Sequence, residues 1–175
     1  MILPFSTQLN GKPTYFVEKI WEAFLQLGIQ FKADEMKIGI EALPEGYKIK
    51  TNSPKIHTIR EDKKNRWKAG VMIDFFIHTR TKDMYRFAPR VKVVSVQKIE
   101  ITYFDEQNPK FTAQLSKIAA EYYNEVEVVV DNEVLNAKAI NELAQNDGFD
   151  TIEDFFAYFN EDFTGKIIHW TDKRY

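Results

Sequence analysis

Apolar patterns typical of strands occur at irregular intervals along this 175-residue chain, and patterns typical of helices fall between them in no fixed order. The predicted strands lie at 71–77, 91–103, 126–130 and 166–170. The run at 91–103 is either one long strand or two strands joined at a bulge. The predicted helices lie at 14–27, 113–123, 136–146 and 151–159. Because helices and strands do not alternate regularly, the sequence predicts an α+β fold with a small mixed β-barrel and flanking helices.

Local signals mark several of these boundaries. Asn136 is a side chain typical of a helix N-cap, and either Asp150 or Thr151 caps the helix that follows. The dipeptide Asp131-Asn132 predicts a hairpin turn that leads into a short strand at 133–134. Gly165 is expected just before the last strand.

Length and composition limit the domain organisation and the chemistry. No repeat, low-complexity run or Ser/Gly-rich linker interrupts the sequence, so residues 1–175 are predicted to form one domain. The chain has no cysteine, which excludes disulfides, zinc–thiolate sites and cysteine nucleophiles. It has neither a signal-peptide pattern nor an apolar run of the roughly 20 residues that span a bilayer, so we expect a cytoplasmic protein with no membrane partner, taken as a monomer.

The net charge is −2, but the charges are unevenly distributed. Residues 55–92 contain eleven Lys/Arg and four Asp/Glu, whereas residues 100–165 contain three Lys and fifteen Asp/Glu. The basic segment could neutralise several phosphates, which favours RNA or a nucleotide as the partner. The two segments could equally pair with each other, and an isoelectric point near 6.0 argues against tight, indiscriminate binding of nucleic acid.

Chemically active side chains are concentrated in residues 54–70. Lys55 could act as a base or nucleophile or bind an anion, and Thr58 could orient a ligand or a water molecule. The alternatives are a surface lysine and an ordinary strand threonine. Residues three apart in a regular strand point to opposite faces, so Lys55 and Thr58 can share a site only if the chain turns between them.

Four neighbouring side chains are candidates for binding a ligand. Arg60 and Arg66 offer forked donors suited to phosphate or carboxylate, although Arg60 could instead pair with an acid of the C-terminal half. His57 could carry a proton near neutral pH or serve as a structural hydrogen-bonding group. Trp67 could stack on a base or plug the end of the barrel.

Motifs for other chemistries are absent from the sequence. The three histidines, His57, His78 and His169, lack the paired spacing of metal ligands. The chain also lacks a Walker-type phosphate loop, a dinucleotide-binding fingerprint and a Gly-x-Ser-x-Gly elbow. We therefore expect neither a metal site nor a cofactor.

The pattern Lys-Ile-His-Thr-Ile-Arg at 55–60, followed by Trp-x-x-Gly at 67–70 and the strand at 71–77, resembles the ASCH domain family. The likeness covers about residues 54–103. It resumes at Asp147-Gly148-Phe149, the helix at 151–159 and the closing strand, and Leu3-Pro4-Phe5-Ser6 is similar to the family's first strand. The resemblance implies a PUA-like fold associated with RNA and modified nucleosides, in which 14–43 and 103–136 are atypical insertions.

The resemblance also implies a catalytic set. Some compact relatives hydrolyse the amide of acetylated cytidine with a lysine and a threonine of this motif and a downstream glutamate. The lysine falls on Lys55, the threonine on Thr58 and the glutamate approximately on Asp147. Aspartate is shorter by one methylene, which could displace a positioned carboxylate by more than about one ångström.

Three functions are compatible with the sequence. The leading one is an ASCH-type module that binds RNA or a nucleotide- or nucleoside-like ligand, with phosphate held by Arg60 and nearby basic residues. The second is a hydrolase, either a nucleoside amidohydrolase or a ribonuclease-like enzyme. The third is a protein-interaction domain that docks a partner on the acidic helices at 136–160. Family resemblance does not choose among these functions.

Overall fold

The computed structural model describes residues 1–29, 31, 54–104 and 126–175. Three helices and eleven strands lie within these residues, so the predicted α+β class is confirmed. The predicted helix at 113–123, and parts of the segments at 14–43 and 103–136, lie outside the described residues. Of the helices described, none is long and apolar enough to cross a membrane.

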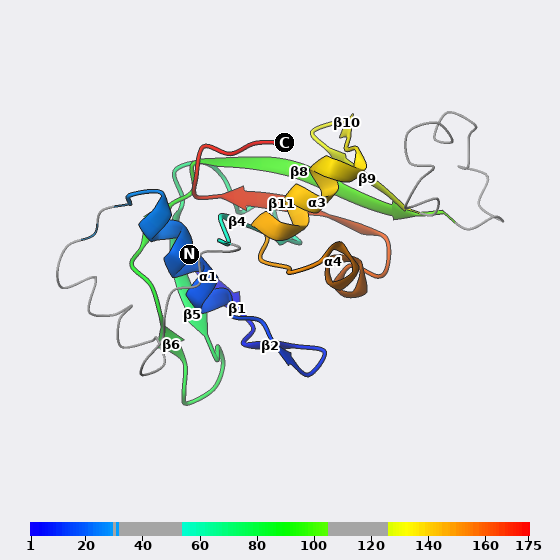
Figure 1. Cartoon of the computed structure of the whole chain (residues 1–175). Coiled ribbons are helices and arrows are strands. Elements are labelled where there is room, and N and C mark those ends of the chain that lie inside the picture. Colours follow the sequence, from blue (N-terminus) through cyan, green and yellow to red (C-terminus); the bar gives the residue numbers. More distant parts are fainter. Residues whose placement is uncertain (30, 32–53, 105–125) are drawn as a thin grey trace.

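A five-stranded antiparallel sheet forms the larger part of the fold (Figure 1). Its strands, in spatial order, are β10 (Glu133–Val134), β9 (Val126–Val130), β8 (Ser95–Tyr103), β11 (Phe163–His169) and β4 (His57–Arg60). Asp131 and Asn132 adopt positive φ values of 48° and 74° between β9 and β10. This is the tight hairpin turn that the sequence predicts.

The second sheet is built around β5 (Met72–Ile77). This strand pairs in parallel with β1 (Ile2–Phe5), and antiparallel with β6 (Tyr85–Arg86) and β7 (Val91–Lys92). A separate two-stranded ribbon contains β2 (Gln8–Leu9) and β3 (Lys12–Pro13). The long run at 91–103 is divided between β7 and β8, and residues 93–94 carry the chain from one sheet into the other.

The two sheets meet along two lines. On one line β7 continues toward β8, and the Val94 N–H donates to the His169 carbonyl at 2.8 Å. On the other line the end strands β1 and β4 are bridged by Arg60, whose Nη2 donates to the Pro4 carbonyl at 2.8 Å. Within residues 1–29, 54–104 and 126–175, backbone pairing therefore gives two larger open sheets, the two-stranded ribbon and no closed barrel.

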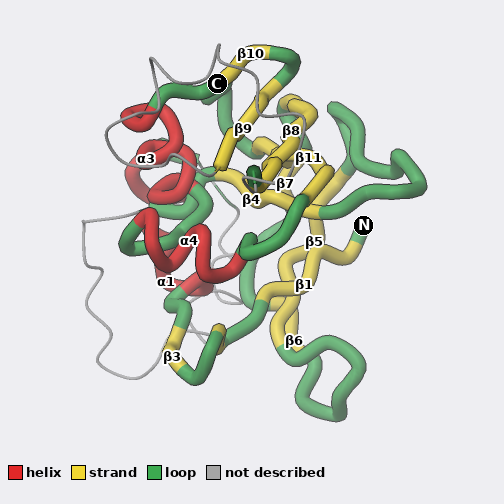
Figure 2. The backbone as a smooth tube through the Cα atoms, turned by 90° about the vertical axis from the view of Figure 1, so that its right-hand side faces the viewer, coloured by secondary structure: helices red, strands yellow, loops and turns green. Residues whose placement is uncertain are grey.

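Figure 2 shows the three helices on one side of the molecule and both sheets on the other. The helices are α1 (Phe16–Gln26), α3 (Ala137–Asn146) and α4 (Ile152–Tyr158). Local capping determines where two of them start, since Asn136 Oδ1 accepts from the Ala139 N–H at 3.0 Å and Thr151 Oγ1 accepts from the Asp154 N–H at 3.1 Å.

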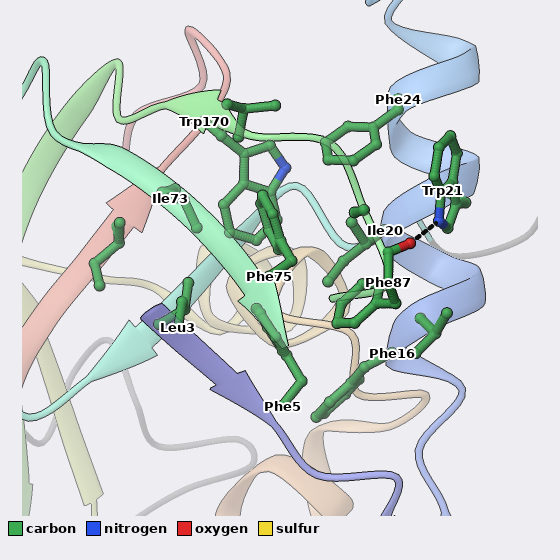
Figure 3. Close-up of a cluster of buried hydrophobic side chains, with 14 of the residues drawn as sticks. Leu3, Phe5, Phe16, Ile20, Trp21, Phe24, Ile73, Phe75, Phe87 and Trp170 are labelled. Atoms are coloured by element: carbon green, nitrogen blue, oxygen red, sulfur yellow. Dashed lines mark hydrogen bonds between the residues drawn. The ribbon is translucent and has the colours of Figure 1, made fainter. Parts of the chain in front are cut away.

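Two apolar clusters fill the interior. In the first, α1 packs on the β5 sheet, and the Trp21 Nε1–H donates to the Phe87 carbonyl at 2.9 Å (Figure 3). In the second, α3 and α4 pack on the five-stranded sheet, with Leu143 and Phe155 fully buried. Strand β4 lies between them, because Ile59 belongs to the second cluster and residues on its other face approach the first.

Gly165 lies inside β11, whereas the sequence predicts it just before the strand. A Cβ atom at this position would lie 2.6 Å from the Arg60 carbonyl oxygen and 2.6 Å from the Phe163 ring. Glycine therefore allows the close pairing of β11 with β4.

We expect Gly165→Ala to lower the free energy of unfolding by about 1–3 kcal/mol, because the added methyl group has to displace the β4 backbone. Thr164→Val, at the exposed neighbouring position of β11, is the matched control and should change stability by less than about 0.5 kcal/mol. Urea denaturation measures both. Equal stability of the two variants would contradict the close approach.

Candidate functional site

The centre of the site is a buried ion pair between Lys55 and Asp147, which are 92 positions apart in the chain. Lys55 Nζ lies 2.5 Å from Asp147 Oδ1 and also donates to the Asp147 backbone carbonyl. The two side chains are 1% and 5% exposed. The Ile59 N–H of β4 donates to the same Oδ1 at 3.2 Å. We call Lys55 and Asp147 the acid–amine pair.

Backbone hydrogen bonds place both members of the acid–amine pair. The Lys55 N–H donates to the Lys19 carbonyl of α1 at 3.0 Å. The next N–H along the chain, that of Ile56, donates to the Asn146 carbonyl at the end of α3, also at 3.0 Å. The pair therefore lies where α1, the start of β4 and the end of α3 meet.

Asp147 and Gly148 of the Asp147-Gly148-Phe149 motif each have a local role. Asp147 caps α3, with its N–H donating to the Leu143 carbonyl at 2.9 Å. Gly148 follows with a φ of 90°, which favours glycine at a helix end. A Cβ there would lie 3.0 Å from the Phe16 ring and 3.1 Å from the Lys55 side chain. Glycine therefore lets the lysine stem pack directly on the backbone that carries its partner.

Burial shifts both groups of the acid–amine pair toward their neutral forms. Loss of solvation lowers the pKa of Lys55 to about 8, against the opposing effect of the Asp147 carboxylate. Loss of solvation likewise raises the pKa of Asp147, against the opposing effect of the Lys55 amine. The ring centroids of Phe16 and Phe5 lie 4.6 Å and 5.9 Å from Nζ. An amine of this pKa beside a carboxylate is suited to exchanging a proton near neutral pH.

Thr58 and Arg60, two residues apart, lie on the same face of β4. Thr58 is 1% exposed and lies opposite Ile168 of β11. The Arg60 guanidinium carbon lies 5.2 Å from the Phe5 ring centroid, which is also the ring near Lys55 Nζ. Because its Nη2 donates to the Pro4 carbonyl, Arg60 connects the two sheets in addition to lying near the acid–amine pair.

His57 lies on the other face of β4, with its ring centroid 5.3 Å from that of His169. It is fully buried there. The structure therefore does not bring His57 into a common site with Thr58 and Arg60.

Asp62 organises the loop that carries Arg66 and Trp67. Its carboxylate accepts from the N–H groups of Arg66 and Trp67 at 2.9 Å and 2.8 Å, and it pairs with Lys166 at 3.1 Å. Burial by itself raises the pKa of Asp62, but these interactions together lower it. Trp67 is 5% exposed and belongs to the first apolar cluster, whereas Arg66 is exposed. Stacking on a ligand base is therefore not open to Trp67 in this arrangement.

Two pockets flank the acid–amine pair. The Phe16 pocket, of about 200 Å³, is lined by Leu9, Asn10, Lys12, Pro13, Thr14, Phe16, Lys19, Gly148, Phe149, Asp150, Asp154, Ala157 and Tyr158. The Arg60 pocket, of about 450 Å³, is lined by Ile59, Arg60, Glu61, Tyr158, Phe159, Asn160, Glu161, Asp162 and Phe163. Gly148 of the first pocket packs against Lys55, and Ile59 of the second donates to Asp147. Tyr158 lines both pockets.

The sequence interpretation missed Lys19 and Tyr158. Lys19 Nζ donates to the Gly148 carbonyl at 2.8 Å and pairs with Asp150 at 2.6 Å, and its side chain is only 12% exposed. The available signal was its position three residues after Phe16, on the apolar face of α1, where a charged residue breaks the pattern. Tyr158, at 41% exposed, gave no comparable signal.

Among the residues that the structure describes, no group of three His, Asp or Glu side chains could hold a metal ion. Comparison with known proteins finds no match for this chain among family models, curated proteins or solved structures.

We expect Lys55→Met and Asp147→Leu each to lower the free energy of unfolding by about 3–5 kcal/mol, because each leaves one buried charge unpaired. The double variant should recover most of this loss, since an apolar pair removes both desolvation costs. Lys98→Met, which breaks the exposed pair with Glu100, is the control and should cost less than about 1 kcal/mol. A double-mutant cycle by chemical denaturation measures the coupling; additive losses would contradict it.

Proposed function

We propose that this chain is an ASCH-type, PUA-like domain that binds RNA or a nucleotide- or nucleoside-like ligand, with the base in the Phe16 pocket. The observation that carries the proposal is the acid–amine pair. The Lys55 and Asp147 motifs are far apart in the chain, yet their side chains meet 2.5 Å apart directly behind a wall of this pocket.

The arrangement of the sheets supports a PUA-like fold. Two open sheets are continuous through β7 and β8 along one line and are bridged by the Arg60–Pro4 hydrogen bond along the other. Such an arrangement is compatible with a barrel in which one seam is not closed by backbone pairing.

The lining of the Phe16 pocket suits a planar polar ring. Phe16, Phe149 and Tyr158 supply aromatic surface, and Asn10 supplies an amide. Its charges compensate one another, because Lys19 pairs with Asp150 at 2.6 Å and Lys12 pairs with Asp154 at 3.5 Å. The pocket therefore offers donors and acceptors to a base without a net charge for phosphate.

The loop at 61–70 is better suited to bind phosphate than the Phe16 pocket is. The side chains of Lys64, Arg66 and Lys68 are exposed there. A longer RNA could contact them, and its affinity would then fall as salt rises, because each phosphate contact releases a counterion.

We expect Tyr158→Ala to weaken nucleoside binding by about 1–3 kcal/mol, the usual contribution of one base–aromatic stack. Tyr158→Phe keeps the ring and is the matched control, which should bind like the original protein. Isothermal titration calorimetry with a panel of nucleosides measures the affinities, and filter binding with short single-stranded RNA at two salt concentrations measures the phosphate contribution. Failure of every nucleoside and every RNA to bind at low salt would refute the proposal.

A second function, nucleoside amidohydrolysis, is favoured by the lowered pKa of Lys55 beside Asp147. The neutral amine would take a proton from a water molecule that Thr58 orients, and the hydroxide would attack the amide carbonyl. The protonated amine would pass this proton through the Asp147 carboxylate to the leaving nitrogen as the carbon–nitrogen bond breaks. Acetylated cytidine and water would give cytidine and acetic acid, which ionises to acetate and a proton. Since Lys55 is 1% exposed, the Gly148 wall would have to move before a substrate reached the amine, and binding is the function that the geometry supports better.

If the domain is a hydrolase, turnover of acetylated cytidine should rise as pH increases through about 8, because only the deprotonated Lys55 amine can act as the base. Lys55→Ala should abolish turnover, and Asp147→Glu should retain part of it. Chromatography of the products at several pH values measures this. Full turnover by Lys55→Ala would exclude the assignment.

A further inference from the structure

A row of buried polar side chains crosses the five-stranded sheet next to the site. His57 of β4 and Ser95 of β8 lie directly opposite His169 of the intervening strand β11. Directly opposite residues of neighbouring strands project on the same face, so the three form one row. Both histidines are fully buried.

The imidazoles of this row lack the hydrogen bonds that buried histidines normally make. Within the part of the chain that the structure describes, neither nitrogen of His169 has a hydrogen-bond partner, and His57 has the Leu143 carbonyl beside it but no well-formed hydrogen bond. The Ser95 hydroxyl is also unpaired within the same residues. A neutral imidazole carries one donor and one acceptor, and leaving them buried and unpaired is unfavourable. Phenylalanine would fill the same space without this cost, so packing alone does not account for two histidines.

Residues 171–175 form a strap over this row. The ring of Tyr175 lies edge-on to His57 at 5.5 Å and also packs on His169 at 6.2 Å. Three hydrogen bonds to other described residues hold Tyr175. Its N–H donates to Gln97 Oε1 at 2.9 Å, its carbonyl accepts from Gln97 Nε2 at 2.8 Å, and its hydroxyl accepts from Asn146 Nδ2 at 2.7 Å.

The cations around the row oppose the protonation of the histidines, whereas Asp131 favours the protonation of His169. Lys55, Lys173 and Arg174 are the nearby cations; Glu142 is paired with Lys173 at 2.6 Å, and Asp131 is paired with Arg174 at 3.0 Å. Burial lowers the pKa of His169 to about 4 and also lowers that of His57, where the Leu143 carbonyl acts in the opposite direction. Asp147 lies close enough to act on Tyr175 as well. The closed arrangement therefore favours the neutral form of both imidazoles.

We propose that residues 171–175 are an acid-released strap, which closes over the neutral His57–His169 pair and opens when these imidazoles take up protons. Opening would also remove the Tyr175 hydroxyl from Asn146, whose carbonyl anchors the Ile56 N–H beside the acid–amine pair. Opening of the strap would therefore weaken the contact between the end of α3 and the start of β4.

The sign of the pH dependence follows from the direction of these shifts. A histidine whose pKa is lower in the closed state than its ordinary value of about 6.5 binds fewer protons when closed. The closed strap is therefore most stable above about pH 6.5. Its stability decreases as pH falls toward the pKa of His169, which is about 4.

Amide hydrogen exchange across this pH range tests the proposal. We expect the protection factor of the Tyr175 amide to fall below pH 6.5 by up to roughly a hundredfold per pH unit, because two imidazoles each take up a proton on opening, while the amides of β9 stay protected. His57→Phe combined with His169→Phe should keep the strap protected throughout. His78→Asn, which removes an exposed histidine at a positive-φ position of 52°, is the matched control and should open like the original protein.

Constant protection of the Tyr175 amide down to pH 4 with β9 intact would overturn the proposal, and so would equal loss of protection in the doubly substituted protein. If that variant does not fold, nuclear magnetic resonance of the unmodified protein tests the proposal instead. The His57 and His169 ring signals must then titrate in parallel with strap opening, and opening without their titration would refute the mechanism.

Discussion

Two charges placed in the interior at one point determine much of the arrangement around them. An amine and a carboxylate leave water at a cost of several kcal/mol each, which only close pairing and additional hydrogen bonds offset. The partners of Lys55 and Asp147 come from three elements: the end of α3, the edge of β4 and, through the backbone of Lys55, helix α1. These elements must keep their relative positions for the ion pair to persist, so the contact acts as a positional constraint rather than a source of net stability.

The helices and most of the strands could be predicted from local patterns. The predicted helices at 14–27, 136–146 and 151–159 agree with α1, α3 and α4 to within two residues at every boundary, because apolar spacing and side-chain caps act over a few residues. The pairing of strands depends on contacts between distant segments, and no local pattern encodes it. The sequence therefore did not reveal that β7 and β8 belong to different sheets, or that β11 needs a glycine within it to approach β4.

The residues of the candidate site also divide into those that sequence motifs identified and those whose placement depends on the folded structure. Lys55 and Asp147 were found through motifs, and their contact is a geometric outcome that the sequence permitted without requiring. The placement of His57 depended on the register of β4 against β11, which sets it opposite His169 and away from the face of Thr58 and Arg60. Lys19 was overlooked because its importance comes from the carbonyl of Gly148, which reaches it only after the chain has folded.

The bridge between Arg60 and Pro4 has a mechanical consequence. A seam closed by a backbone ladder can open only if several hydrogen bonds break together, whereas this one is held by a guanidinium that donates to a carbonyl and rests on Phe5. Rotation of one long side chain is a fast motion, and it would release the edges of both sheets while leaving every strand pair intact. Contact between the two sheets along this line, next to the Phe5 ring near the buried amine, therefore depends on one side chain and not on a strand ladder.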